Sequence, residues 1–124
     1  MKAVVLDTNA WLLPFTDKTD VERELERLLG AFSMHLPQSV QRELETLAKG
    51  QGQVARAAQG ALKLAGRATL HPGGLPGDDG VLQLARNLQA VVLSNDRLVL
   101  QEARKAGLGC IGSRGQGALQ WRHR

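Results

Sequence analysis

The sequence contains a single cysteine and very few aromatic residues. Cys110 is the only cysteine among 124 residues, and two Trp and two Phe with no Tyr make up an aromatic fraction of 3%. A lone cysteine excludes internal disulfides, and it favours a reducing compartment and a role in packing. So few aromatic rings leave little surface on which unpaired bases could stack.

Long apolar runs and the common nucleotide-binding loops are also absent. No stretch approaches the roughly 20 apolar residues of a membrane span, and no charged start and apolar run of a signal peptide is present, so we expect a cytoplasmic protein with no membrane association. No Gly-x-Gly-x-x-Gly follows the first apolar run and no P-loop occurs, which disfavours dinucleotide binding. The three histidines have no metal-ligand spacing.

Acidic residues are missing from the middle of the chain. Eight of the twelve Asp and Glu precede residue 46 and none lies between residues 46 and 77, while the formal net charge is +4. The later two thirds should therefore present a positive surface. A polyanionic partner and an ordinary solvated basic face explain this pattern about equally well.

Apolar patterns typical of strands and helices alternate along the chain. Residues 3–6 and 90–93, both AVVL, are β-branched runs without alternation, as in strands covered on both faces. Weaker strand candidates are residues 32–36, 68–71 and 109–112. Helical patterns with capping residues cover residues 21–29, 40–47, 54–64, 81–88 and 97–107, with Thr19 or Asp20, Ser39 and Asp96 as candidate N-caps.

This alternation predicts an α/β fold, a three-layer α/β/α sandwich around a four- to five-stranded parallel sheet, because parallel neighbours need crossover helices. The length suits one domain with one core. We expect that domain to span residues 1–114, followed by a basic C-terminal tail, residues 115–124, that is frayed or docked.

Acidic residues follow each of the first four predicted strands. Asp7 comes directly after the first, Glu43 lies early in the helix after the second, Asp78 and Asp79 open the helix after the third, and Asp96 follows the fourth. Carboxyl ends of parallel strands share one edge of the sheet. Like charges about 4 Å apart repel by about 4 kcal/mol at an effective dielectric of 20, so either the pKa values rise or Mg²⁺ or Mn²⁺ binds. Taken singly, each acid is explained equally well as a cap or turn former.

Four stretches, VVLDTNAWLL, SVQRELETLA, DDGVLQLA and VVLSNDRLVLQEARKAG, together resemble the PIN domain (PilT N-terminal) nuclease family over nearly the whole chain. The resemblance implies a parallel sheet between helices and metal-dependent endonuclease activity, usually on RNA. Asp7, Glu43, Asp79 and Asp96 match the acidic quartet of the family. Asp79 matches better than Asp78 because the family places its acid directly before the apolar run, but the doubled acid leaves the choice open.

Roles for these residues follow from the resemblance as hypotheses. Asp7 and Asp96 would hold one Mg²⁺ or Mn²⁺ directly, and Asp79 and Glu43 would complete the site through water or a second ion. Three polar side chains would orient the ligands from outside the first shell: Asn9, Ser94 and Asp78. Four basic residues are candidates to contact the phosphate backbone of RNA: Arg97, Arg104, Lys105 and Arg114.

The family includes VapC-like toxins that a protein antitoxin holds inactive, and nucleases that process ribosomal RNA precursors. The short chain and the loop before Asp78 slightly favour the processing type. RNA, an antitoxin and a second copy of the chain are therefore the candidate partners.

Two other functions remain open. A Mg²⁺-dependent phosphatase of the haloacid dehalogenase kind also uses carboxylates at strand ends, but it needs a second Asp where this chain has Asn9. A non-catalytic module that binds RNA or assists assembly could use the same fold.

Overall fold

The computed structural model describes all residues from Met1 to Arg124. Its strands are β1 (Lys2–Leu6), β2 (Phe32–Pro37), β3 (Thr69–His71), β4 (Val91–Leu93), β5 (Cys110–Gly115) and β6 (Ala118–His123). Its helices are α1 (Thr8–Thr16), α2 (Val21–Leu29), α3 (Gln38–Ala48), α4 (Gly52–Ala65), α5 (Gly77–Leu88) and α6 (Arg97–Lys105). The strands form one sheet in the order β3-β2-β1-β4-β5-β6, in which only β6 runs antiparallel to its neighbour.

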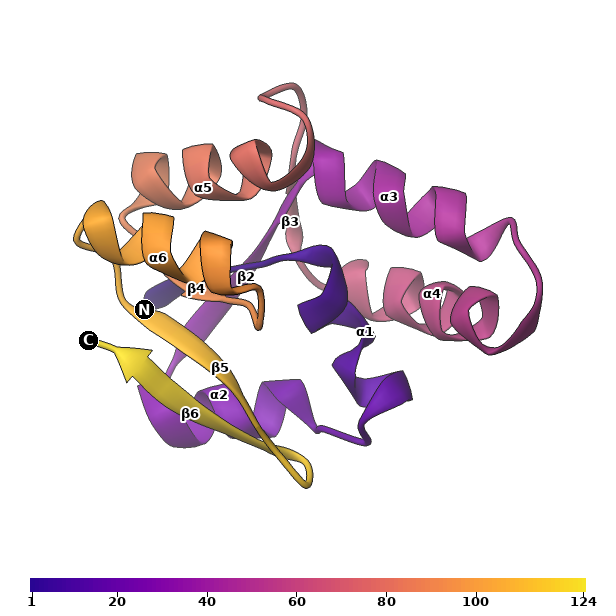
Figure 1. Ribbon diagram of the computed structural model, residues 1–124, viewed down its shortest axis with the longest axis horizontal. Coiled ribbons are helices and arrows are strands. Elements are labelled where there is room, and N and C mark those ends of the chain that lie inside the picture. The colour runs from indigo at the N-terminus through magenta and orange to yellow at the C-terminus, as the bar shows by residue number, and fades with distance from the viewer.

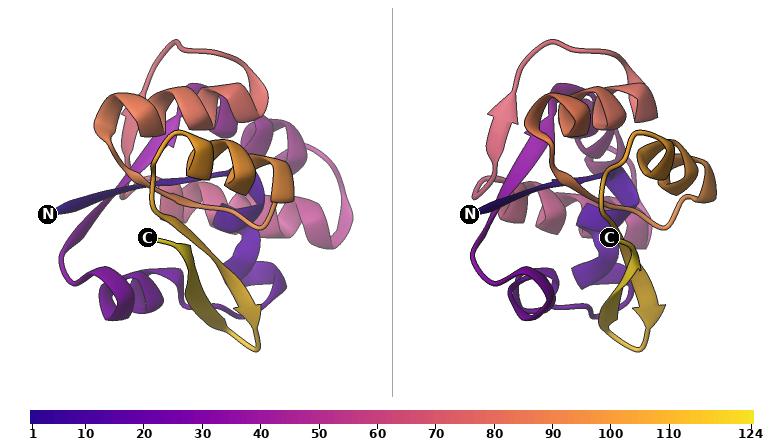
Figure 2. Two further views of the ribbon diagram at one scale, coloured as in Figure 1. Left: turned by 60° about the vertical axis from the view of Figure 1, so that its left-hand side comes forward. Right: turned by 90° about the vertical axis from the view of Figure 1, so that its left-hand side faces the viewer.

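The helices cover both faces of this sheet, as the sandwich architecture requires. Figure 2 shows α5 on one side of the sheet and α2 on the other. Helices α1, α3 and α4 pack against one another and lie at the right of Figure 1, where β1 and β2 end. The predicted α/β sandwich with a parallel sheet is thus confirmed, and an antiparallel sixth strand is added to it.

The two AVVL runs lie at the centre of the sheet. Val4, Val5 and Leu6 of β1 are fully buried, and so are Val92 and Leu93 of the neighbouring β4. A strand covered on both faces needs no polar alternation, which explains the continuous apolar pattern. Burial of these side chains from water supplies much of the driving force for folding.

The residues expected to form a tail instead include a strand. β6 pairs with β5 through a turn at Gly115, Gln116 and Gly117, all three with positive φ. The backbone of Leu119 in β6 is also fastened to α2, because its N–H donates to Glu24 Oε1 at 2.9 Å and its carbonyl accepts from Arg27 Nη2 at 2.8 Å. The Arg27 bond and then the Leu119 N–H lower the pKa of Glu24 to about 2. Residues 118–123 are therefore an ordered edge of the sheet (Figure 1).

The helix ends differ in detail from the sequence-based predictions. Asp20, one of the two predicted caps, caps α2 by accepting from the Arg23 N–H at 3.1 Å, and Gly30 ends that helix. Ser39 does not cap α3: Pro37 precedes the helix, and the Ser39 hydroxyl donates to the Gly77 carbonyl at 3.1 Å, which joins α3 to α5. None of the helices combines the length and hydrophobicity that crossing a membrane requires.

Candidate functional site

Asp7 is a buried carboxylate at the point where β1 becomes α1. Its side chain is 5% exposed and caps α1, with Oδ1 accepting from the Ala10 N–H at 2.9 Å. The hydroxyl of Ser94 donates to the other carboxylate oxygen, Oδ2. A buried carboxylate is costly unless it is hydrogen-bonded, and both oxygens of Asp7 are.

Ser94 connects Asp7 to the loop that follows β4. Its hydroxyl, besides donating to Asp7, accepts the Asp96 N–H at 2.9 Å. Asp96 in turn caps α6, accepting from the Leu98 N–H at 2.8 Å. One buried hydroxyl therefore holds the carboxylate at the end of β1 in a defined position relative to the loop that carries Asp96.

Electrostatic repulsion couples three of the carboxylates. Burial raises the pKa of Asp7, the bonds from Ser94 and the Ala10 N–H lower it, and repulsion from Asp78 and Asp96 adds to the increase. Partial burial also raises the pKa of Asp78, as does repulsion from Asp96 and Asp79. Asp78 and Asp96 thus act on Asp7, and Asp96 acts on Asp78, although the three carboxylates follow separate strands.

The remaining predicted acids are less closely involved in this coupling. Asp79 acts on Asp78 but is not among the groups that shift the pKa of Asp7. Glu43 is an exposed side chain in the middle of α3, and Asn9 is exposed in the first turn of α1. Asp78 is thus the member of the pair that repels Asp7, whereas the sequence pattern favours Asp79.

Carboxylate oxygens are the ligands that Mg²⁺ and Mn²⁺ prefer, so the donor atoms of Asp7, Asp78 and Asp96 suit such an ion. Their mutual repulsion would be relieved by a cation. With the side chains placed as they are, no group of three or more His, Cys, Asp or Glu is arranged as a metal site. The fit of these residues to a divalent ion is thus one of chemistry and charge.

The basic residues predicted to contact RNA lie in different environments. Arg97 and Arg104 of α6 line a cavity of about 320 Å³ next to Asp96, together with Arg122 of β6. Lys105 instead pairs with Glu102 at 3.3 Å, and Arg114 on β5 is close enough to Glu24 to help lower its pKa. Sequence reasoning missed Arg122 because it lay in the expected tail.

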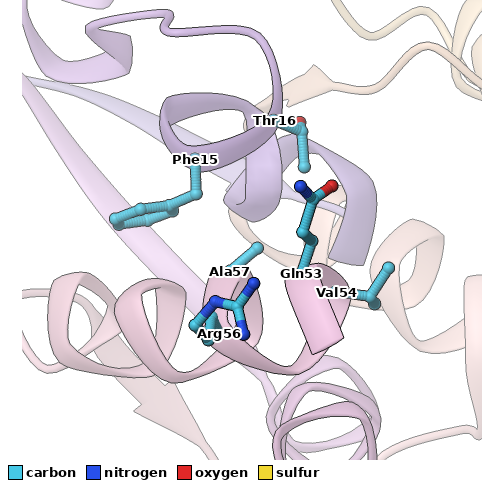
Figure 3. A pocket seen from close by; sticks show the side chains of 6 residues that line it. All are labelled: Phe15, Thr16, Gln53, Val54, Arg56 and Ala57. Carbon is cyan, nitrogen blue, oxygen red and sulfur yellow. The ribbon is translucent and has the colours of Figure 1, made fainter. Parts of the chain in front are cut away.

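A second cavity, of about 560 Å³, lies between α1 and α4 and is lined by none of the acids. Figure 3 shows Phe15 and Thr16 of α1 together with the α4 side chains around it. Phe15 and Val54 on its rim are 46% and 54% exposed, and no acidic residue lines it. This cavity has none of the groups that metal or acid–base chemistry would need.

Comparison with known proteins agrees with this architecture. A family model described as a PIN like domain matches residues 4–116. The structure of the PIN domain endonuclease Utp24 superposes with a TM-score of 0.81 at 24% identity, covering 98% of this chain and 92% of that one. A domain of a functionally unknown protein from Methanocaldococcus jannaschii DSM 2661 has a TM-score of 0.60 at 17% identity, covering 89% of each chain.

No curated protein matched the sequence. The two structural likenesses establish the fold. The family model spans most of the residues, from β1 through the turn after β5, and it confirms the resemblance first seen in the four sequence stretches. The chain therefore belongs to the PIN-like domain family.

Proposed function

We propose that the protein is an endoribonuclease that hydrolyses phosphodiester bonds of RNA at the carboxylates of Asp7, Asp78 and Asp96 with the help of Mg²⁺ or Mn²⁺. The observation that carries this proposal is the buried Asp7 carboxylate, which is coupled by repulsion to acids from two other strand exits. Membership of the PIN-like family supports it, as does the shared fold with a protein described as a PIN domain endonuclease.

In this proposal Asp7, Asp78 and Asp96 are the residues that hold the ion. A divalent ion held by them would supply a water of lowered pKa and a positive charge to polarise the scissile phosphate. Asp78 takes the place that the sequence pattern assigns to Asp79, because Asp78 is the acid that acts on Asp7. Asp79 and Glu43 contribute negative charge nearby or contacts through water.

The surrounding residues orient the carboxylates and the substrate. Ser94 keeps the Asp7 carboxylate from rotating freely and fixes the backbone of Asp96, which is the task of an outer-shell hydrogen bond. Asn9 is exposed to solvent, and in this proposal its side chain orients water near the ion. Arg97 and Arg104 attract the phosphates of the RNA, so binding should weaken steeply with salt.

We further propose a role in processing RNA precursors such as ribosomal RNA, on the basis of the loop before Asp78. A toxin would purify from its native source with a small antitoxin bound to it. Sedimentation of the purified protein would show whether it forms a homodimer. These two measurements would show whether an antitoxin or a second copy of the chain is a partner.

The test is cleavage of labelled single-stranded RNA with Mg²⁺ or Mn²⁺, compared with a chelator and with Asp7→Asn. Glu26→Gln is a matched control because Glu26 is an exposed acid on α2, on the face of the sheet opposite α5. We expect metal-dependent cleavage that Asp7→Asn abolishes and Glu26→Gln retains. RNA that is bound but never cut would support the non-catalytic module, and hydrolysis of small phosphate esters alone would support the phosphatase.

A further inference from the structure

Three arginines from two separate elements line a cavity that Asn95, the residue before Asp96, also borders. Arg97 and Arg104 come from α6 and Arg122 from β6, and no Asp or Glu lines the cavity of about 320 Å³. The ion pairs of the structure involve other basic residues, Arg27, Arg67 and Lys105. The three guanidinium groups at the cavity thus have no carboxylate partner, and the cavity carries positive charge that no acid neutralises.

Gly112 provides the space in which Arg122 lies. A Cβ atom at Gly112 would be 2.8 Å from Arg122 Nε and 3.1 Å from both Asn95 Oδ1 and the Ser94 carbonyl oxygen, so a methyl group there would displace the Arg122 side chain. Arg122 Nη2 also donates to the Ser113 carbonyl at 2.7 Å, and Asn95 Oδ1 accepts the Ser113 N–H at 2.7 Å. The guanidinium of Arg122 is therefore held across β5, beside the loop of residues 94–96.

We propose that the cavity bounded by Arg97, Arg104 and Arg122 binds a phosphate group of the RNA substrate, next to the phosphate that is cut. Guanidinium groups present planar pairs of N–H donors that match phosphate oxygens, and they stay charged at every physiological pH. The group could be a backbone phosphodiester or a terminal 5′-phosphate, which share this chemistry. The inference rests on the proposed endoribonuclease function, and it gives β6 a direct part in substrate binding.

The experiment measures RNA binding without divalent ions, so that it does not depend on cleavage. Fluorescence anisotropy in chelator would compare a short single-stranded RNA carrying a 5′-phosphate with the same RNA carrying a 5′-hydroxyl. Arg122→Met should weaken binding about tenfold, as the loss of one charge-assisted contact implies, and should reduce the slope of log affinity against log salt by about 0.7. Arg56→Met is the matched control, because Arg56 lies on α4, which packs against α1 and α3.

The two RNAs distinguish the two sources of phosphate. Weaker binding of both RNAs by Arg122→Met assigns the cavity to a backbone phosphate, and weaker binding of the phosphorylated RNA alone assigns it to the 5′ end. Gly112→Ala is a second variant that keeps the net charge but pushes the Arg122 side chain aside, and it should weaken binding in the same way. Thermal unfolding of each variant checks that the sheet is intact.

The proposed phosphate cavity would be overturned if Arg122→Met and Gly112→Ala both bind RNA with the same affinity and the same salt slope as the Arg56→Met control. If that happens while the wild-type protein still cuts RNA, the nuclease proposal stands and only the cavity fails. If Arg122→Met weakens binding and the wild-type protein cuts nothing with any metal, the cavity stands as an RNA site and the nuclease proposal fails.

Discussion

Replacing Ser94 with alanine should destabilise the fold more at neutral pH than at acidic pH. The Ser94 side chain is 1% exposed and its hydroxyl bonds both the Asp7 carboxylate and the Asp96 N–H. Ser94→Ala leaves the buried carboxylate with the Ala10 N–H as its remaining hydrogen bond, and it leaves the Asp96 N–H without its partner. The size of the effect therefore depends on whether Asp7 is charged.

A hydrogen bond to a charged group contributes about 1.5–3 kcal/mol and a bond between neutral groups about 0.5–1.5 kcal/mol. Burial already raises the pKa of Asp7 above its ordinary value, and the Ser94 bond opposes that rise, so Ser94→Ala should raise it further. A carboxyl whose pKa is raised in the folded state destabilises the fold as the pH climbs through that pKa. We expect a loss of about 1.5–3 kcal/mol near pH 7 and about 1 kcal/mol near pH 4.

Urea unfolding followed by circular dichroism at the two pH values would measure this difference. Ser39→Ala is the control, because the Ser39 hydroxyl donates to the neutral, exposed carbonyl of Gly77. Its loss should stay below about 1.5 kcal/mol at both pH values. An equal loss for Ser94→Ala at both pH values, or a greater loss at acidic pH, would refute the reasoning that Asp7 is a destabilised, buried charge.

Three other substitutions test the site and its support. Asp7→Asn removes the buried charge and keeps an oxygen to cap α1. In chelator near neutral pH it should therefore raise the thermal unfolding midpoint by a few degrees, and a lower midpoint would contradict the raised pKa of Asp7. Asp78→Asn should slow RNA cleavage about tenfold more than Asp79→Asn, and the reverse order in a single-turnover assay would restore Asp79 as the main ligand. Gly80→Ala would place a Cβ against the Leu75 carbonyl oxygen, and should cost about 1–3 kcal/mol in urea unfolding through strain between α5 and its preceding loop. Unchanged stability would show that the loop yields freely.

The regular elements of the sandwich could be predicted because their sequence patterns are local. The two AVVL runs are β1 and β4, and the three weaker candidates are β2, β3 and β5, each with slightly different ends. α6 begins after Asp96 and ends at Lys105, because an N-cap and a terminal glycine bracket it.

Two elements had no such signal. α1 is apolar on nearly every side and contains Pro14, so it lacks the periodicity of an amphipathic helix. β6 is an edge strand of mixed polarity whose position depends on contacts from Glu24 and Arg27, far away in the sequence. Contacts of that kind cannot be deduced from local pattern.

The sequence predicts that the acids lie at the strand ends, but it does not predict how their side chains are arranged. Topology alone brings Asp7, the Asp78–Asp79 pair and Asp96 to one edge. The choice between Asp78 and Asp79 depends on how α5 is rotated, which adjacent acids in one helix cannot reveal. The part played by Ser94 likewise depends on β4 lying directly beside β1, since only that pairing puts its hydroxyl against Asp7.

The central claim is that carboxylates from separate strand exits share one divalent ion. Titration of the protein with Mn²⁺, following the electron paramagnetic resonance signal of the free ion, tests this directly and needs no RNA. We expect one strongly bound Mn²⁺ per wild-type chain, displaced by Mg²⁺, and little or no binding by Asp7→Asn or Asp96→Asn. Wild-type protein that leaves the free signal unchanged, or Asp7→Asn that binds Mn²⁺ as tightly as the wild type, would contradict the claim.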